Sequence, residues 1–210
     1  MKNISFLDCP TVDECSGKKL STVIDCSRIH GLRELWVRDE GMQNFYHLES
    51  LEILHILNRK KVLNLEKIST NTNLTKLCCM FCGFHSLSGI ENLHKLQCLE
   101  LSYCRSLYDI SGLSEISDVL LTLDIENCPK ITDFSVLTTL ENLEILSLFG
   151  TNELPNLSFL ENTKKIKIFC FSINVGDGNL SPCLKLPYVY CKKNRKHYNL
   201  KDCNLPKNLP

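Results

Sequence analysis

Residues 96–104 read LQCLELSYC, and this stretch decides the fold. Leucines occupy its first, fourth and sixth places and a cysteine its ninth, which gives the pattern L-x-x-L-x-L-x-x-C. The same spacing returns about every 22 residues along most of the chain. A period of that length predicts a solenoid, in which each repeat forms one coil and buries its apolar side against the next.

Eight coils can be placed in one register, because leucine-like residues return at the first, fourth and sixth places. These places are Leu32/Leu35/Val37, Leu51/Leu54/Ile56, Leu74/Leu77/Cys79, Leu96/Leu99/Leu101, Leu120/Leu123/Ile125, Leu143/Leu146/Leu148, Thr163/Ile166/Ile168 and Leu186/Val189/Cys191. Successive first places are 19, 23, 22, 24, 23, 20 and 23 residues apart. We therefore assign residues 32–194 to about eight repeats.

The spacing has a direct physical reason. Alternate side chains of a strand point to opposite faces, so the fourth and sixth places face the core while the third, fifth and seventh face outward. We expect neighbouring coils to pair these strands in parallel, as one sheet on the concave side of a horseshoe-shaped α/β solenoid. The return halves, such as DISGL and DFSVL, predict 3-10 or short helical turns on the convex side, with Asp and Ser as caps.

The two ends of the chain depart from the repeat. Residues 1–31 carry the apolar runs ISFLDC and TVIDC, which resemble each other more than the later coils, and we interpret them as an N-terminal cap. Residues 195–210 are polar and include Pro206 and Pro210, which predicts a C-terminal cap or tail. The GDG of residues 176–178 predicts a turn before the last coil.

Composition limits the classes of partner. Lys and Arg together number 24, as do Asp and Glu, so no net charge draws the chain to nucleic acid or to an anionic membrane. The N-terminus lacks the apolar run of a signal peptide, and no window approaches the roughly 20 apolar residues of a membrane span. We therefore expect a cytoplasmic protein with no membrane partner, whose 13 cysteines are reduced.

A short basic run could still contact nucleic acid. It comprises Lys192, Lys193, Arg195 and Lys196. Because this run is isolated in a neutral chain, a solvated surface is the favoured interpretation, and we expect no nucleic-acid partner.

The cysteines raise the question of a metal site. Cys79 and Cys82 form a C-x-x-C pair, so a zinc site has to be considered. The register points elsewhere, because Cys79 is an inward sixth place. Cys82, Cys104 and Cys128 are ninth places, where a thiol can satisfy backbone groups of the turn after the strand. We predict packing thiols, no metal and no cofactor.

The sequence contains no catalytic motif. It has no G-x-S-x-G nucleophile elbow and no H-E-x-x-H zinc motif, and SGKK at residues 16–19 lacks the first glycine and the Ser/Thr of a phosphate loop. The six histidines are scattered, and we interpret them as solvated or hydrogen-bonded. We predict that the protein is not an enzyme, with a hydrolase site in the irregular ends as the alternative.

The outward strand positions carry the functional hypothesis. They include the only tryptophan and several other aromatic residues, with acidic residues in the middle coils and lysines toward the C-terminal end. The candidate partner-binding residues are Trp36, Arg38, His55, Glu100, Tyr103, Asp124, Glu126, Phe149, Lys167, Phe169, Tyr188 and Tyr190. Aromatic anchors dominate protein interfaces, and separated charge orients a partner. The alternative is that loops half-bury these side chains, or that they are scattered apolar residues of the ordinary kind.

The pattern L-x-x-L-x-L-x-x-C/N, with its D-I/F-S-x-L return half, resembles leucine-rich-repeat proteins of the short type, as in bacterial internalin-like domains. This resemblance covers residues 32–194 and implies the fold but little about function. The stretch LPYVYCKKNRKHYNLKDCNLP, residues 186–206, is similar to the end of small cytoplasmic bacterial leucine-rich-repeat proteins encoded beside polymorphic toxins. That similarity implies an immunity protein, whose partner is a cognate toxin domain.

A further resemblance points to a different role. CPKITDFSVL, residues 128–137, is similar to the cysteine-containing repeats of F-box ubiquitin-ligase adaptors. It implies a general scaffold or adaptor for substrate recognition, but those repeats are longer and no F-box-like helical pattern precedes them here. We therefore favour stoichiometric binding of a toxin through the concave face. The sequence leaves the oligomeric state open.

Overall fold

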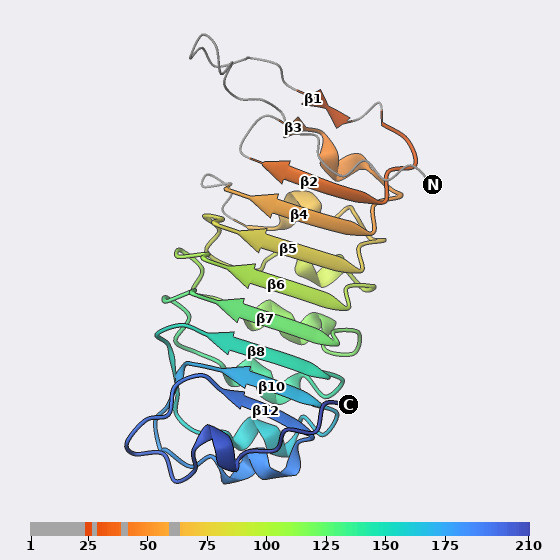
Figure 1. Ribbon diagram of the computed structural model, residues 1–210. Helices are drawn as coiled ribbons and strands as arrows, with labels where there is room; N and C mark the ends of the chain where they lie inside the picture. Colours follow the sequence, from red (N-terminus) through yellow and green to blue (C-terminus); the bar gives the residue numbers. More distant parts are fainter. Residues whose placement is uncertain (1–23, 27–28, 39–41, 59–63) are drawn as a thin grey trace, which may run out of the picture.

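The computed structural model describes residues 24–26, 29–38, 42–58 and 64–210. They form a stack of coils, each of which adds one strand to a long parallel sheet along one side of the molecule (Figure 1). The strand order is β12-β10-β8-β7-β6-β5-β4-β2, which confirms the predicted solenoid. The strands are β2 Glu34–Arg38, β4 Ile53–Leu57, β5 Lys76–Met80, β6 Cys98–Ser102, β7 Thr122–Glu126, β8 Ile145–Phe149, β10 Ile168–Phe171 and β12 Tyr188–Cys191.

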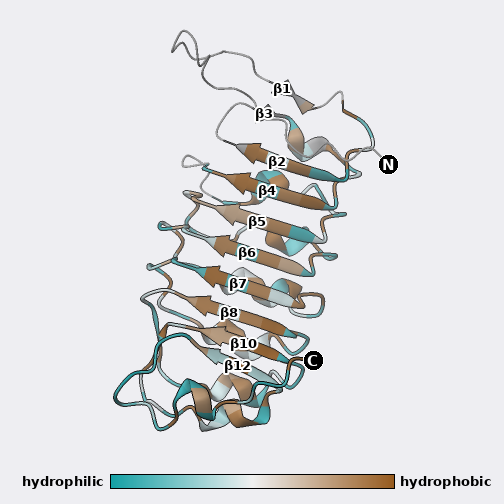
Figure 2. Ribbon diagram, in the orientation of Figure 1, coloured by the Kyte–Doolittle hydropathy of each residue, from teal (hydrophilic) through white to brown (hydrophobic). Residues whose placement is uncertain are grey.

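The strands form because their alternate residues are apolar. Leu99 and Leu101 of β6 are fully buried, whereas the residues on either side of them are half-buried. Leu99 lies opposite Leu77 of β5 and Leu123 of β7, so leucines stack in columns through the core. Each buried leucine contributes roughly 1.5–3 kcal/mol. Figure 2 shows the result, with largely apolar strands joined by more polar loops.

Short 3-10 helices close the core behind the sheet (Figure 1). At the start of η5 Ser111–Ile116, the side-chain Oδ1 of Asp109 accepts the N–H of Ser111 at 2.9 Å. Asp133 does the same for Ser135 at 2.8 Å, at the start of η6 Ser135–Thr139. Each Asp stands one residue before the N-cap position, so it satisfies an N–H of the first turn without being the capping residue itself. The other helices of the coils are η2 Phe45–His47, η3 Glu66–Ile68, η4 Ile90–Asn92, η7 Ser158–Glu161 and η8 Ser181–Lys185.

Two-residue strands also pair in parallel outside the main sheet. β1 Ile24–Asp25 pairs with β3 Met42–Gln43, and β9 Glu153–Leu154 pairs with β11 Asn174–Val175. Before β2, the structure describes only residues 24–26, which include β1, and residues 29–33. The N-terminal cap predicted for residues 1–31 therefore lies mostly outside the described residues.

The ninth-place cysteines tie each coil to the one before it. Cys82, Cys104 and Cys128 are buried. Their thiols donate to carbonyl oxygens of the preceding coil at 3.5 Å, on Ile56, Cys79 and Leu101 respectively. In the next coil the amide of Asn152 takes this role and donates to Cys128 O at 2.9 Å. The prediction that these thiols satisfy backbone groups of the turn is confirmed.

The seventh coil departs from the predicted register. Phe169 of β10 lies opposite Leu146 of β8, and Phe169 and Phe171 are fully buried. The inward strand residues are therefore three positions later than predicted, and the outward placement of Phe169 is wrong. Residues 168–171 read IFCF, which is apolar in both alternations. The two phenylalanine rings stack with centroids 4.8 Å apart and Ile166 is buried as well, so this register buries more apolar surface than one that turns both rings outward.

Residues 195–210 fold back over the last coil. Tyr198 and Leu205 are buried, and η9 Asp202–Asn204 lies between them. The carbonyl of Pro206 accepts the N–H of Val189 at 2.9 Å, and Lys207 forms an antiparallel bridge with Tyr188. This segment therefore covers the edge of β12 that does not pair with β10.

Candidate interaction face

The outward residues of the main sheet form one continuous surface, called here the sheet face. The strand register places the fifth-place residues of successive coils in one row across it. From β2 to β12 this row reads Trp36, His55, Cys78, Glu100, Asp124, Ser147, Cys170 and Tyr190. Aromatic groups therefore stand at the two ends of the row, and carboxylates stand in the middle.

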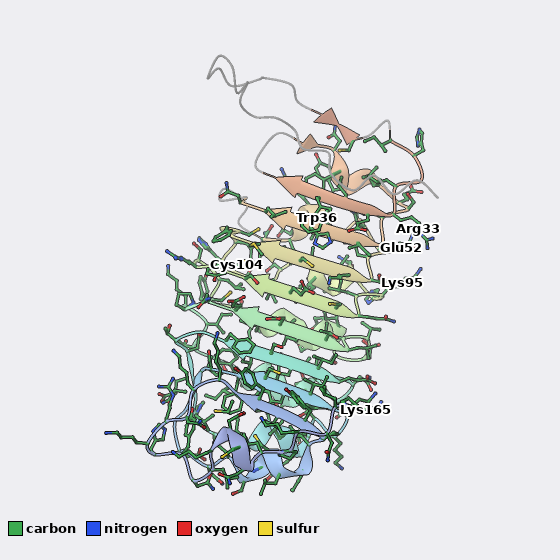
Figure 3. The ribbon with its side chains drawn as sticks, in the orientation of Figure 1. Arg33, Trp36, Glu52, Lys95, Cys104 and Lys165 are labelled. Carbon is green, nitrogen blue, oxygen red and sulfur yellow. The ribbon has the colours of Figure 1, made fainter. Side chains whose placement is uncertain are left out.

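Trp36 and His55 form a flat platform at the β2 end. Their rings stack with centroids 3.7 Å apart and planes 8° apart. Trp36 Nε1 donates to Glu34 Oε1 at 3.1 Å, and His55 Nε2 lies 3.4 Å from the same oxygen. Burial lowers the pKa of His55 although Glu34 opposes this, so the imidazole is neutral at pH 7. Trp36 remains 37% exposed over the sheet (Figure 3).

Glu100 organises the centre of the face. Its carboxylate accepts hydrogen bonds from Lys76 Nζ at 2.6 Å, Cys78 Sγ at 3.1 Å and Cys98 Sγ at 3.7 Å. Burial opposes its ionisation, but these donors outweigh burial and lower the pKa of Glu100. Burial raises the pKa of Cys98 to about 11 and that of Cys78 further. Both thiols are therefore hydrogen-bond donors and not nucleophiles at neutral pH.

Asp124 has a different environment from its neighbour Glu100. It lies directly opposite Glu100 on β6, and Glu126 follows it on the same face of β7. No described side chain donates a hydrogen bond to it or forms an ion pair with it. Burial, and then the charges of Glu100 and Glu126, raise the pKa of Asp124 to about 6. The middle of the sheet face therefore carries negative charge that Lys76 compensates only at Glu100.

The β12 end combines aromatic rings with a lysine from the C-terminal segment. Lys207 Nζ lies 5.7 Å from the ring centroids of both Tyr188 and Tyr190. The same ammonium donates to Asp202 Oδ1 at 2.7 Å, which holds it in place. Tyr190 is 38% exposed. Sequence reasoning missed Lys207 and Asp202, because no repeat pattern indicates that residues after the last coil return to this face.

The remaining candidate residues divide by position. Glu126 and Tyr103 are half-buried on the outward side, and Phe149 is half-buried with Lys192 Nζ 5.8 Å from its ring. Lys167 is exposed but lies one place before β10, where it pairs with Glu144 at 2.7 Å at the amino-terminal ends of the strands. Its predicted place in the central row is wrong for the same register reason as Phe169. The side chain of Arg38 lies outside the described residues.

The exposed side chains of Met80 and Phe81 and the half-buried side chain of Tyr103 form a surface that we call the aromatic ridge. Met80 ends β5 and is 38% exposed, and Phe81 follows it and is 46% exposed. The Phe81 ring stacks on Tyr103 of the next coil, with centroids 4.9 Å apart and planes 23° apart. The register alone could have selected Met80 and Phe81, since they are the seventh and eighth places of their coil.

A groove of about 480 Å³ lies at the other end of the strands, beside the residues that precede β2, β4, β5 and β6. It is lined by Gly31, Arg33, Ser50, Glu52, Asn73, Thr75 and Lys95. Arg33 pairs with Glu52 at 2.5 Å and Lys95 donates to Asn73 at 2.7 Å, so its charged groups have partners within the chain (Figure 3).

Two further properties of the described residues bear on candidate ligands. No cluster of three or more His, Cys, Asp or Glu side chains in this part of the chain could hold a metal ion. Within the same part, every helix is too short or too polar to cross a membrane.

Comparison with protein-family models finds no matching family, and comparison with curated proteins finds no match either. Solved structures do match. Internalin C2 of Listeria monocytogenes superposes with a TM-score of 0.56 at 23% identity, over 82% of this chain and 76% of that one. A leucine-rich-repeat protein of Leptospira interrogans superposes with a TM-score of 0.50 at 17% identity, over 82% of this chain and 51% of that one. These likenesses show the fold, which is that of a leucine-rich-repeat solenoid.

Proposed function

We propose that the chain is a protein-binding module that holds its partner on the sheet face, and that the partner is a toxin domain neutralised by this binding. One observation carries the proposal. The face presents exposed Trp36 and Tyr190 toward its two ends and Asp124, which has no described partner, between them. Rigid aromatic anchors supply much of the energy of protein interfaces, and charge sets partner orientation and approach.

The toxin part of the proposal has separate support. Residues 186–206 resemble the end of bacterial leucine-rich-repeat proteins encoded beside toxins. A neutralising protein needs only to occlude the toxin surface, so it requires no catalytic group. The acidic middle of the face is complementary to a toxin with a basic substrate-binding surface.

The binding function is tested by co-purification from native cell extract. The tagged full chain is compared with Trp36→Ala, Asp124→Lys and Tyr190→Ala, and the bound proteins are identified by mass spectrometry. Tyr108→Ala is the matched control, since Tyr108 is 57% exposed and lies on a loop outside the sheet. We expect the partner to be lost with the first three variants and kept with the control. Retention by all three would show that the sheet face is the wrong surface.

The toxin function is tested by expressing the identified partner alone and together with the chain. Growth arrest by the partner, relieved by the wild-type chain and not by Asp124→Lys, is the expected result. A partner that is harmless when expressed alone would instead favour the general scaffold or adaptor role.

A further inference from the structure

We propose that the partner contacts the sheet face off-centre, with an apolar side chain on the aromatic ridge and an adjacent Lys or Arg against Asp124 and Glu126. This proposal rests on the proposed binding function and states the chemistry of the partner's contact segment. It also places the contact over β5 to β7 and the turns that follow these strands.

The apolar half of the contact is the ridge itself. Met80 and Phe81 are among the most exposed large apolar residues in the described chain, at 38% and 46%. The Phe81 ring is stacked on Tyr103, and Met80 directly precedes Phe81 at the end of β5, so two contiguous rings stand beside a further exposed apolar residue. Contiguous exposed apolar residues mark interaction sites, whereas single ones are ordinary.

The backbone at the ridge indicates that these aromatic residues are not there to stabilise the fold. Phe81 and Tyr103 both have φ of 55°, in the left-handed region. Equivalent turns after other strands use Asn58, Asn127 and Gly150, which are residue types that accept positive φ. The fold alone would favour Asn or Gly at these two positions. An aromatic residue at such a position strains the backbone and leaves apolar surface in contact with solvent. This combination is typical of functional positions.

The charged half of the contact adjoins the ridge. Ser102, which precedes Tyr103, lies opposite Glu126, and the N–H of Tyr103 donates to the Glu126 carbonyl at 2.8 Å. On the same face of β7, Asp124 is the outward residue before Glu126. Around Asp124, β6 presents Glu100, β8 presents uncharged Ser147, and β7 itself presents Glu126.

The charge balance selects one kind of occupant. Lys76 is already bound to Glu100 at 2.6 Å, and no described cation reaches Asp124. A cationic side chain of the partner would therefore form ion pairs with both Asp124 and Glu126, while the apolar residue next to it covers the ridge. An acidic or purely apolar segment would leave carboxylates buried without a counter-charge, which is costly.

The test uses a phage-displayed library of random 12-residue peptides as the probe. Peptides are selected on the full chain, with counter-selection on Phe81→Asn. This substitution removes the ring but restores the residue type found at the equivalent turns, so the variant is expected to fold. We expect the enriched peptides to combine Leu, Ile, Phe or Trp with a nearby Lys or Arg.

Affinity measurements on a synthetic peptide from this selection then locate the contact. We expect binding to weaken at least about 10-fold on Phe81→Asn and on Asp124→Asn, and to be unchanged on Tyr108→Ser. Added salt should weaken binding to the wild type more than binding to Asp124→Asn, in which only Glu126 of the two carboxylates remains. The absence of enriched peptides, enriched peptides without a cation, or equal binding to Phe81→Asn would each overturn the proposal.

Two further outcomes separate this proposal from the general function. If Phe81→Asn converts a wild-type dimer to a monomer, the ridge is occupied by a second copy and the proposal falls. If Trp36→Ala and Tyr190→Ala lose the cellular partner while Phe81→Asn keeps it, the off-centre contact falls but the binding function stands.

Discussion

At the scale of single residues, Asp124 opposes the stability of the fold. It is a carboxylate on a half-buried row, placed directly opposite Glu100 and beside Glu126. Like charges facing each other across neighbouring strands destabilise a sheet. Glu100 avoids this cost through Lys76 and two thiols, whereas Asp124 has no described donor. A residue that breaks a local rule without compensation is expected where function requires it.

Replacing Asp124 with Asn should raise the free energy of unfolding by about 1 kcal/mol at pH 7. This is less than the pKa difference alone implies, because the side chain is partly solvated. The pKa of Asp124 is raised to about 6 in the folded chain from an ordinary 3.8. The contribution of the Asp124 carboxyl to the stability of the fold is therefore most favourable below pH 3.8. This contribution is lost as the pH rises through 3.8 toward 6.

Urea unfolding followed by circular dichroism at pH 7.5 and pH 4.5 checks this prediction. The gain of Asp124→Asn over wild type should shrink at the lower pH, where the wild-type carboxyl is protonated in the folded chain. Glu115→Gln on η5, outside the sheet face, should change the stability by less than about 0.5 kcal/mol at either pH. A gain that does not depend on pH would show that charge is not its cause.

Cys104 is a residue whose role is structural. Its thiol donates to Cys79 O at 3.5 Å and to Ser102 O at 3.6 Å in a fully buried site. We expect Cys104→Ala to lower the free energy of unfolding by about 1–3 kcal/mol, because two carbonyls lose a donor and a small cavity forms. Exposed Cys203→Ala should have little effect in the same urea titration. Stoichiometric zinc in the purified wild type would contradict the packing role.

At the scale of elements, the repeat pattern predicts every strand of the sheet but one. It succeeds where inward places are aliphatic and outward places are polar, as in β6 and β7. It fails at β10, where residues 168–171 are apolar in both alternations. Step length does not settle the register there, because a first place at Thr163 gives steps of 20 and 23 residues and one at Ile166 gives steps of 23 and 20. In such a strand the packing of the side chains decides, since a shift by an odd number of residues exchanges the inward and outward faces.

The leucine columns provide the stability prediction at this scale. Leu99→Ala or Leu123→Ala should lower the free energy of unfolding by about 2–5 kcal/mol, since both side chains are fully buried between neighbouring coils. Thermal melting of the purified variants measures the loss. Leu209→Ala is the control, because this leucine is 69% exposed and should leave the melting temperature unchanged. Unchanged melting of both core variants would contradict the register of β6 and β7.

At the scale of the whole molecule, the repeat predicts which residues face outward but not what they meet there. Trp36, Asp124 and Tyr190 could be placed on one face from spacing alone, because strand alternation is a local property. The bonds to Glu100, from Cys78 on the neighbouring strand and from Cys98 on the same strand, depend on side-chain rotamers, which spacing does not determine. Lys207 reaches Tyr188 and Tyr190 only because the chain reverses direction after the last coil. The parts that could not be predicted are therefore the non-periodic ones.

The reversal after the last coil leads to a prediction about association. The segment 206–208 covers the outer edge of β12: Pro206 O accepts the Val189 N–H at 2.9 Å, and Lys207 Nζ donates to Val189 O at 2.7 Å. An uncovered edge strand presents unpaired backbone groups to other chains. A variant that ends at Leu205 should therefore self-associate more than the full chain, which size-exclusion chromatography with light scattering over a concentration series would detect.

The matched control for this truncation is Lys207→Ala in the full chain. It removes the lysine bonds to Val189 and Asp202 but keeps the Pro206 carbonyl on the strand edge. If backbone covering is what prevents association, Lys207→Ala should keep the mass of the full chain while the truncated variant grows with concentration. Equal association of the two variants would assign the effect to the lysine charge, because charged side chains at an edge also oppose strand pairing. An unchanged mass for both would show that the segment does not protect the end of the solenoid.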